Sequence, residues 1–314
     1  MTDGVLAVSA ATLKFRNPIV LAAGTAGYGV ELDGVMDLDL LGGFVTKAVS
    51  IFPRPGAAAP RVAEFEGGMI NAVGLANPGL PEVANTHVPW LAAHHRGTRR
   101  LANVIGFAVE EFAAVINGLE QAAEKHPGAL DGYELNVSCP NTKQGGAEFG
   151  ADPVSLRAVV ASARAETKRP LFVKLAPTLP DIATAAKVSV DAGADGITVI
   201  NTFPGLVVDL DRRRPVLGFG SGGVSGAAIL PVGVLATWKV SRAVRVPVMG
   251  LGGVASGTDA LQYIMAGATL VGVGTAALRD PRAPARIVRE MHAWCVQHAV
   301  QSLQSVRGTL EWPA

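Results

Sequence analysis

The segment Tyr133-Glu134-Leu135-Asn136-Val137-Ser138-Cys139-Pro140-Asn141 begins as an apolar strand, becomes polar at Asn136 and is interrupted by Pro140. Two amides and a thiol are therefore gathered at a strand end, and backbone that follows a strand is where a rigid scaffold usually presents its chemistry. A buried cysteine beside a turn is the ordinary interpretation of one such thiol. The rest of the chain decides between that interpretation and a functional site.

Short apolar runs recur along the chain, and each is followed by a polar residue or a glycine. Continuous apolar runs of this length are typical of parallel strands that are buried on both faces. The eight runs are 18–23, 43–46, 101–105, 133–135, 171–173, 197–200, 248–251 and 270–273.

Helical patterns separate most of these runs, at 110–125, 153–167, 181–192, 231–244, 258–266 and 284–300. Asp152 before Pro153 is a typical helix start, with a capping side chain and proline at the first helical position. Eight strand–helix units in 314 residues predict an α/β fold, a single (β/α)8 TIM barrel over residues 1–314. A doubly wound sheet would show a GxGxxG turn after an early strand, and residues 24–29 do not match that spacing.

Two connections are too long to be simple loops. The first is 48–100, whose segment 66–79 is rich in amides, glycine and proline and does not resemble a helix. The second is 202–226, which contains a basic run at Arg212-Arg213-Arg214. We expect both excursions to lie near the mouth of the barrel at the carboxyl ends of its strands.

The composition excludes several classes of function. A net charge of +1 provides no basic surface for nucleic acid. The two cysteines do not make a disulfide framework, and no CxxC or His/Cys spacing predicts a metal site. The longest uncharged run, between Arg214 and Lys239, is interrupted by glycines and a proline, so we expect no membrane span. Without an export signal at the N-terminus, the expected location is the cytoplasm.

Polar residues follow several of the predicted strands, where the active sites of such barrels lie. Each unpaired polar group costs about 1–3 kcal/mol to bury, so a packed core would not carry so many of them. A bound polar ligand would offset that cost. The residues are Lys47, Asn103, Asn136, Lys174 and the pair Asn201-Thr202.

Glycines follow the last two predicted strands, at Gly252-Gly253 and at Gly274-Thr275. Glycine allows backbone N–H groups to approach an anion, and this end of a barrel is a frequent phosphate site. The sequence therefore predicts a ligand that carries a phosphate. Glycines that serve only close packing between strand and helix are the alternative.

Over residues 5–296 this order of motifs resembles the class 1 dihydroorotate dehydrogenases. Residues 136–141 resemble the Asn-x-Ser-Cys-Pro-Asn catalytic stretch of that family, and Asn71-Ala72-Val73-Gly74-Leu75 with Asn77-Pro78-Gly79 resembles its substrate loop. Lys143-Gln144-Gly145-Gly146 and Ile200-Asn201-Thr202 resemble the NAD-linked class 1B catalytic subunit. Ala23 departs from the pattern, because many relatives have serine there near the flavin.

The resemblance implies an FMN-dependent oxidation of dihydroorotate to orotate in pyrimidine biosynthesis, with Cys139 as the catalytic base. The implied substrate residues are Lys47, Asn71, Ala72, Val73, Gly74, Leu75, Asn136, Asn141, Asn201 and Thr202. The implied FMN residues are Lys47, Ala48, Asn103, Asn136, Lys174, Ile200, Gly226, Gly252, Gly253, Gly274 and Thr275. It also implies a homodimer of this chain and a partner subunit that carries FAD and a 2Fe–2S cluster.

Four other functions stay open at this point. They are a dihydropyrimidine dehydrogenase-like flavoenzyme, a fumarate-linked class 1A dihydroorotate dehydrogenase, a phosphate-binding lyase that uses Lys47 or Lys174 as a Schiff base, and a barrel without catalytic activity. Turnover of dihydroorotate against dihydrouracil separates the first from the prediction. A flavin spectrum excludes the lyase.

Overall fold

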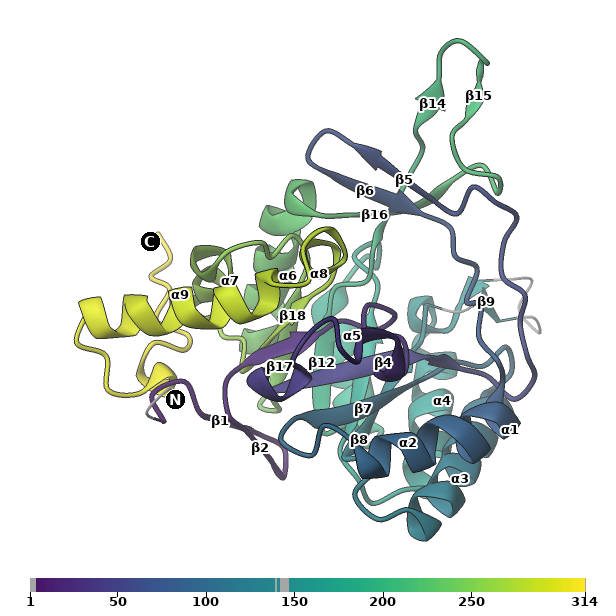
Figure 1. Cartoon of the computed structure of the whole chain (residues 1–314), viewed down its shortest axis with the longest axis horizontal. Helices are drawn as coiled ribbons and strands as arrows, with labels where there is room; N and C mark the ends of the chain where they lie inside the picture. The colour runs from purple at the N-terminus through teal and green to yellow at the C-terminus, as the bar shows by residue number, and fades with distance from the viewer. Residues whose placement is uncertain (1–3, 139, 142–146, 314) are drawn as a thin grey trace.

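Eight parallel strands close into a barrel in the computed structural model, which describes residues 4–138, 140–141 and 147–313 (Figure 1). Their order around the barrel is β11-β12-β17-β18-β3-β4-β7-β8. The strands are β3 (Ile19–Leu21), β4 (Gly43–Val49), β7 (Arg99–Val104), β8 (Gly132–Asn136), β11 (Leu171–Leu175), β12 (Gly196–Val199), β17 (Val248–Leu251) and β18 (Leu270–Val273). Each predicted apolar run corresponds to one of them, so the predicted barrel is confirmed.

Helices surround the barrel and bury their apolar faces against it. They include α3 (Val109–Lys125), α4 (Pro153–Ala165), α5 (Ile182–Asp191), α6 (Leu230–Ala243), α7 (Gly257–Met265) and α9 (Ala283–Gln297). In α3, Phe112, Val115, Ile116 and Leu119 follow helical spacing and are all fully buried. The predicted cap of α4 is also present, because the Asp152 side chain accepts a hydrogen bond from the backbone N–H of Ser155 at 2.8 Å.

The first excursion, 48–100, contains two different structures. Its first half forms the antiparallel hairpin of β5 (Val62–Phe65) and β6 (Gly68–Asn71). Its second half is helical, with α1 (Leu80–Glu82), a π-helical turn (Val83–His87) and α2 (Val88–Ala93) packed beside α3 (Figure 1). The expectation of an excursion over the whole range is therefore wrong for residues 80–93. Val83, Val88 and Leu91 are buried at helical spacing, and this segment is the outer helix between β4 and β7.

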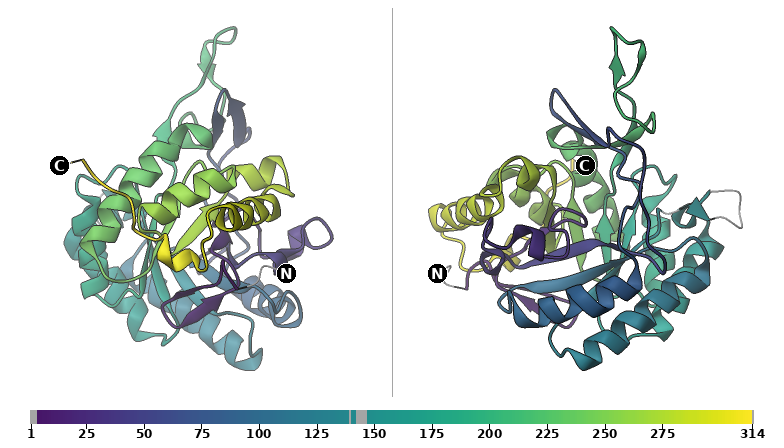
Figure 2. Two further views of the ribbon diagram at one scale, coloured as in Figure 1. Left: turned by 90° about the vertical axis from the view of Figure 1, so that its left-hand side faces the viewer. Right: turned by 45° about the vertical axis from the view of Figure 1, so that its right-hand side comes forward.

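The second excursion, 202–226, is made of short strands. They are β13 (Phe203–Gly205), β14 (Val208–Asp209), β15 (Arg214–Pro215) and β16 (Gly222–Ser225). Strand β16 pairs with β6, which joins both excursions in one four-stranded sheet of order β13-β16-β6-β5. The β14–β15 hairpin projects away from the barrel in every view (Figures 1 and 2).

Smaller elements complete the described chain. The hairpin of β1 (Val8–Ala10) and β2 (Leu13–Phe15) lies at the N-terminus, and α8 (Thr275–Arg279) follows β18. The short strands β9 (Pro140–Asn141) and β10 (Ala147–Glu148) pair with each other after β8. Among the helices that the structure describes, none combines the length and the apolar composition that a bilayer crossing requires.

Candidate active site

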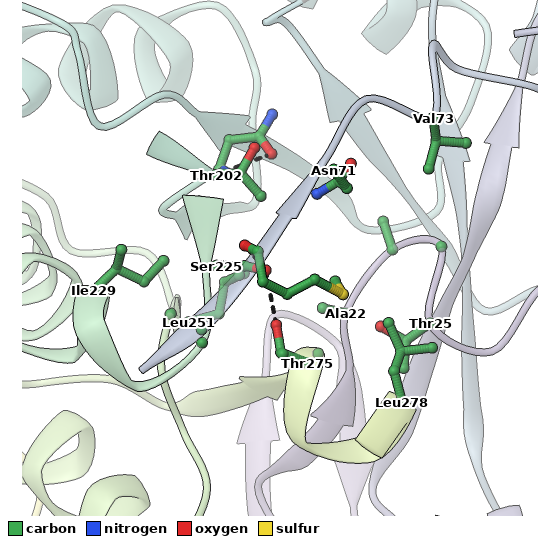
Figure 3. A pocket seen from close by; sticks show the side chains of 18 of the residues that line it. Ala22, Thr25, Asn71, Val73, Thr202, Ser225, Ile229, Leu251, Thr275 and Leu278 are labelled. Atoms are coloured by element: carbon green, nitrogen blue, oxygen red, sulfur yellow. Dashed lines mark hydrogen bonds between the residues drawn. The ribbon is translucent and has the colours of Figure 1, made fainter. Parts of the chain in front are cut away.

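A cavity of about 620 Å³ opens at the carboxyl ends of the barrel strands, beneath the sheet formed by the two excursions (Figure 3). It contains every predicted substrate and cofactor residue apart from Asn141. These residues are Lys47, Ala48, Asn71, Ala72, Val73, Gly74, Leu75, Asn103, Asn136, Lys174, Ile200, Asn201, Thr202, Gly226, Gly252, Gly253, Gly274 and Thr275. Asn141 belongs to β9, and Cys139 lies outside the described residues.

Amide side chains form one wall of the cavity. The Asn201 side-chain amide donates to Oδ1 of Asn136 at 3.3 Å, and Asn201 Oδ1 accepts from the Thr202 N–H at 2.9 Å. Asn71 donates from Nδ2 to the carbonyl of Gly223 at 3.2 Å, a contact between residues 152 positions apart. These bonds fix how the amides are oriented, and a polar ring can be recognised by their remaining donors and acceptors.

Two lysines provide positive charge from two different strands of the barrel. Lys174 is buried within β11 and lies beside Asn136 in the register of β8 and β11. Lys47 lies in β4, where the register with β7 shifts between Val45 and Ala48. Within the described ranges neither lysine has a carboxylate within 4.0 Å. Both charges are therefore available to an anionic ligand.

The irregularity in β4 is supported from the loop that follows β3. The Lys47 N–H donates to the carbonyl of Gly27 at 2.7 Å, and the Tyr28 hydroxyl donates to the carbonyl of Ala48 at 2.9 Å. A bulge re-aims side chains at a strand end. Here it places both Lys47 and Ala48 in the cavity lining.

Glu134 is a buried carboxylate near the site that was not among the predicted site residues. It lies in β8 with 1% exposure, and its Oε1 accepts from Asn103 Nδ2 at 2.9 Å. Because this carboxyl oxygen accepts from the Asn103 amide nitrogen, the amide oxygen of Asn103 points elsewhere. The available signal was a charged residue inside an otherwise apolar strand.

Glycines and hydroxyls also line the cavity. Gly252 and Gly253 follow β17 with φ values of 128° and 75°, a region in which side chains are strained. Thr275 begins α8, and its hydroxyl donates to the Ser225 hydroxyl of β16 at 2.8 Å (Figure 3). Ser225 is a further lining residue that was absent from the predicted site.

No group of three or more His, Cys, Asp or Glu side chains in the described part of the chain is arranged to hold a metal ion. The polar groups of the cavity are amides, hydroxyls, backbone, two lysines and the guanidinium of Arg279, which also pairs with Glu64. This donor set is suited to an organic ligand that is both polar and anionic.

Comparison with known proteins gives a consistent result. Residues 5–294 match the family model described as dihydroorotate dehydrogenase. A Trichlorobacter lovleyi chain named dihydroorotate dehydrogenase B (NAD(+)), catalytic subunit, is 44% identical over 306 residues, covering 98% of each chain. A Pelobacter propionicus chain of the same name has the same identity and coverage. A Solibacter usitatus chain with the provisional name dihydroorotate dehydrogenase A (fumarate) is 43% identical, covering 98% of this chain and 99% of that one.

These similarities extend over nearly the whole chain and therefore include both the barrel and the excursions above its mouth. The family model alone spans all eight barrel strands and every residue of the cavity lining. The chain belongs to the dihydroorotate dehydrogenase family.

Proposed function

We propose that this chain oxidises dihydroorotate to orotate in pyrimidine biosynthesis, as the catalytic subunit of an NAD-linked enzyme. The observation that best supports the proposal is that lysines, amides and glycine turns from many different strands line one cavity. Family membership supplies the reaction, and the relatives of the NAD-linked type supply the acceptor.

FMN is the proposed cofactor, and the residues present fit it. The cavity has the volume of a site for a large ligand, and both glycine turns and amide side chains line it. Gly252, Gly253, Gly274 and Thr275 would hold the phosphate, while Lys174 and Asn103 would contact the ring. When bound, FMN supplies the acceptor for the hydride that leaves dihydroorotate.

The amide wall is proposed to bind the substrate. Orotate presents ring N–H and carbonyl groups together with a carboxylate, and Asn71, Asn136 and Asn201 offer the matching donors and acceptors. The loop Ala72-Val73-Gly74-Leu75 and Asn141 would complete this contact. Lys47 also lines the cavity, and its charge is proposed to attract the carboxylate and to contact the flavin.

Oxidation of dihydroorotate also releases a proton, from the carbon next to the one that loses the hydride. Cys139 is proposed to take this proton, since a free thiol titrates at about pH 8.5 and can be adjusted toward the working pH. The assignment comes from its position in the sequence, three residues after the end of β8 at Asn136.

We also propose a domain organisation, a cellular location and partners for the chain. We expect one domain over residues 1–314, since the hydrophobic core is continuous from Leu6 to Val306. We also expect a homodimer in the cytoplasm and a partner subunit with FAD and a 2Fe–2S cluster. The name catalytic subunit, which the NAD-linked relatives carry, supports the existence of a partner.

A fumarate-linked enzyme is the second candidate. The Solibacter usitatus relative has nearly the same identity and coverage as the NAD-linked relatives. The two candidates share substrate, FMN and catalytic base, and they differ only in where the electrons go.

The visible spectrum of the purified chain tests the proposal, followed by anaerobic addition of dihydroorotate. We expect a yellow protein whose flavin absorbance is bleached by dihydroorotate and hardly changed by dihydrouracil. Bleaching by dihydrouracil alone would instead support the dihydropyrimidine dehydrogenase-like function. A colourless protein that is trapped by borohydride with a substrate would contradict the flavoenzyme proposal.

A further inference from the structure

Tyr263 of α7 is fully buried and contacts Gly252, which lines the cavity. Its hydroxyl donates a hydrogen bond of 2.6 Å to the backbone carbonyl of Gly252. Burial raises the pKa of the Tyr263 phenol, so the hydroxyl stays protonated and able to donate. A side chain outside the cavity therefore holds a peptide group that lines it.

The space around the Tyr263 ring depends on glycines from two other elements. A Cβ on Gly233 of α6 would clash with the Tyr263 hydroxyl, and a Cβ on Gly250 of β17 would clash with the ring. A methyl group at either position would thus push the tyrosine away from the Gly252 carbonyl. This arrangement of three elements around one ring indicates a specific position for its hydroxyl.

The hydrogen bond also determines where the neighbouring N–H points. The peptide bond between Gly252 and Gly253 is trans, and in a planar trans peptide the C=O and N–H groups point in opposite directions. With the Gly252 carbonyl directed at Tyr263, the Gly253 N–H is directed away from the tyrosine. Both glycines line the cavity, and this N–H has no hydrogen-bond acceptor among the described residues.

An unpaired N–H beside a cavity is a donor for an anion. The backbone of this turn cannot easily adjust by itself, because a Cβ at Gly253 would approach the Leu230 nitrogen to 2.7 Å and the segment packs against α6. The turn is therefore tightly fitted, and Tyr263 sets the direction of its peptide group.

We propose that Tyr263 is a positioning residue that orients the Gly252–Gly253 peptide so that the Gly253 N–H donates to the phosphate of FMN. The inference rests on the proposed flavin site and assigns part of its phosphate recognition to a side chain that never touches the ligand. It distinguishes Tyr263 from an ordinary core tyrosine, which would contribute only to stability.

The test compares FMN with riboflavin, which has the same ring and ribityl chain but no phosphate. The full-length chain is freed of flavin and titrated with each compound by fluorescence, as wild type and as Tyr263→Phe. Loss of one oriented hydrogen bond should weaken FMN binding by about 3- to 10-fold and leave riboflavin binding within about 2-fold. The ³¹P resonance of bound FMN should also shift, because one phosphate contact is altered.

Tyr133→Phe is the matched control. Tyr133 is also fully buried, and within the described chain its hydroxyl bonds no residue that lines the cavity. This variant should change the ratio of FMN to riboflavin affinity by less than about 2-fold, below the effect of one hydrogen bond.

If Tyr263→Phe weakens the binding of FMN and of riboflavin equally, the tyrosine has only a structural role and the inference is wrong. Unchanged binding of FMN would also overturn the inference. Should Tyr263→Phe fold poorly, Gly233→Ala displaces the same hydroxyl, and also approaches the Leu251 carbonyl, and it must reproduce the FMN-selective loss. Absence of flavin binding by the wild type would instead remove the proposed function and this inference with it.

Discussion

At the scale of single residues, the cysteine that follows β8 carries the proton transfer in the proposed reaction. Cys139→Ala should still bind FMN and orotate, yet dihydroorotate should reduce its flavin at least ~100-fold more slowly, as expected when acid–base catalysis is lost. Cys139→Ser should keep some rate that rises toward high pH, because a hydroxyl is a far weaker acid. Stopped-flow reduction under anaerobic conditions measures both.

Two controls make the cysteine prediction specific. The dissociation constants of FMN and orotate should stay close to those of the wild type, which shows that the site is intact. Flavin reduction at a normal rate by Cys139→Ala at neutral pH would remove Cys139 from the mechanism.

Lys174 and Asn71 are expected to serve different ligands. Lys174 is buried in a barrel strand, whereas Asn71 lies in the excursion sheet and bonds Gly223. Lys174→Ala should change the flavin spectrum or its retention. Asn71→Ala should leave the spectrum intact and weaken orotate binding by ~1–3 kcal/mol, the cost of leaving polar groups unpaired.

Spectra of the purified variants and orotate titrations check this pair of assignments. A changed flavin spectrum in Asn71→Ala, together with normal flavin but weak orotate binding in Lys174→Ala, would reverse the two roles. Equal effects on both ligands in both variants would show that the site is disturbed as a whole.

At the scale of elements, the helix starts contribute stability that depends on pH. Asp181 caps α5 by accepting hydrogen bonds from Thr184 Oγ1 at 2.7 Å and from two backbone N–H groups at 3.0 Å. The bond from the Thr184 side chain is the main reason that the pKa of Asp181 is held below its ordinary value of 3.8. A depressed carboxyl pKa stabilises the fold above the ordinary value, and this stabilisation is lost as the pH falls through the depressed value.

Asp181→Asn should therefore lower the melting temperature at neutral pH, and its difference from the wild type should shrink on strong acidification. Thermal unfolding followed by circular dichroism at both conditions measures this. Asp211→Asn, an exposed change in the β14–β15 connection, serves as the control and should leave the melting temperature nearly unchanged. A difference between Asp181→Asn and the wild type that grows on acidification would contradict the assigned sign.

The two excursions both contribute residues to the site, and they do so through strands that pair with each other. Strand β6 brings Asn71 from the first excursion, and β16 brings Ser225 from the second. Their antiparallel pairing places both side chains over the carboxyl ends of the barrel strands.

At the scale of the whole molecule, the destination of the electrons distinguishes an NAD-linked from a fumarate-linked enzyme. The described chain has no metal-binding cluster, and the sequence has neither a cysteine cluster for iron–sulfur nor a GxGxxG turn for a dinucleotide. If the enzyme is NAD-linked, NAD must be reduced on another polypeptide. The chain alone should then reduce an artificial dye with dihydroorotate but should not reduce NAD.

Addition of the partner subunit should restore NAD reduction and give a stable complex with two copies of each chain on gel filtration. Fumarate is the informative alternative acceptor. Efficient fumarate reduction by the isolated chain, without NAD activity in any pairing, would show that the class assignment is wrong while the substrate assignment stands.

The barrel and most of the cavity lining follow from local patterns in the sequence. Buried parallel strands produce continuous apolar runs, and polar residues that interrupt them, such as Lys174 and Asn136, are visible without a structure. Because the carboxyl ends of all barrel strands converge, a residue that follows any strand can be placed near the others from its position alone. The helices could also be predicted, because the 3.6-residue spacing of apolar residues and the capping residues both depend on near neighbours in the sequence.

Features that depend on contacts between distant residues could not be predicted from the sequence. The bulge that places Lys47 and Ala48, the bond between Asn103 and Glu134, and the pairing of β6 with β16 join residues far apart in the chain. The helical half of the first excursion was missed because its apolar spacing follows a segment rich in glycine and proline. The proposed role of Tyr263 depends on the hydrogen bond from its hydroxyl to the Gly252 carbonyl. The sequence could not predict this role, because hydrogen bonding across a fold leaves no local pattern.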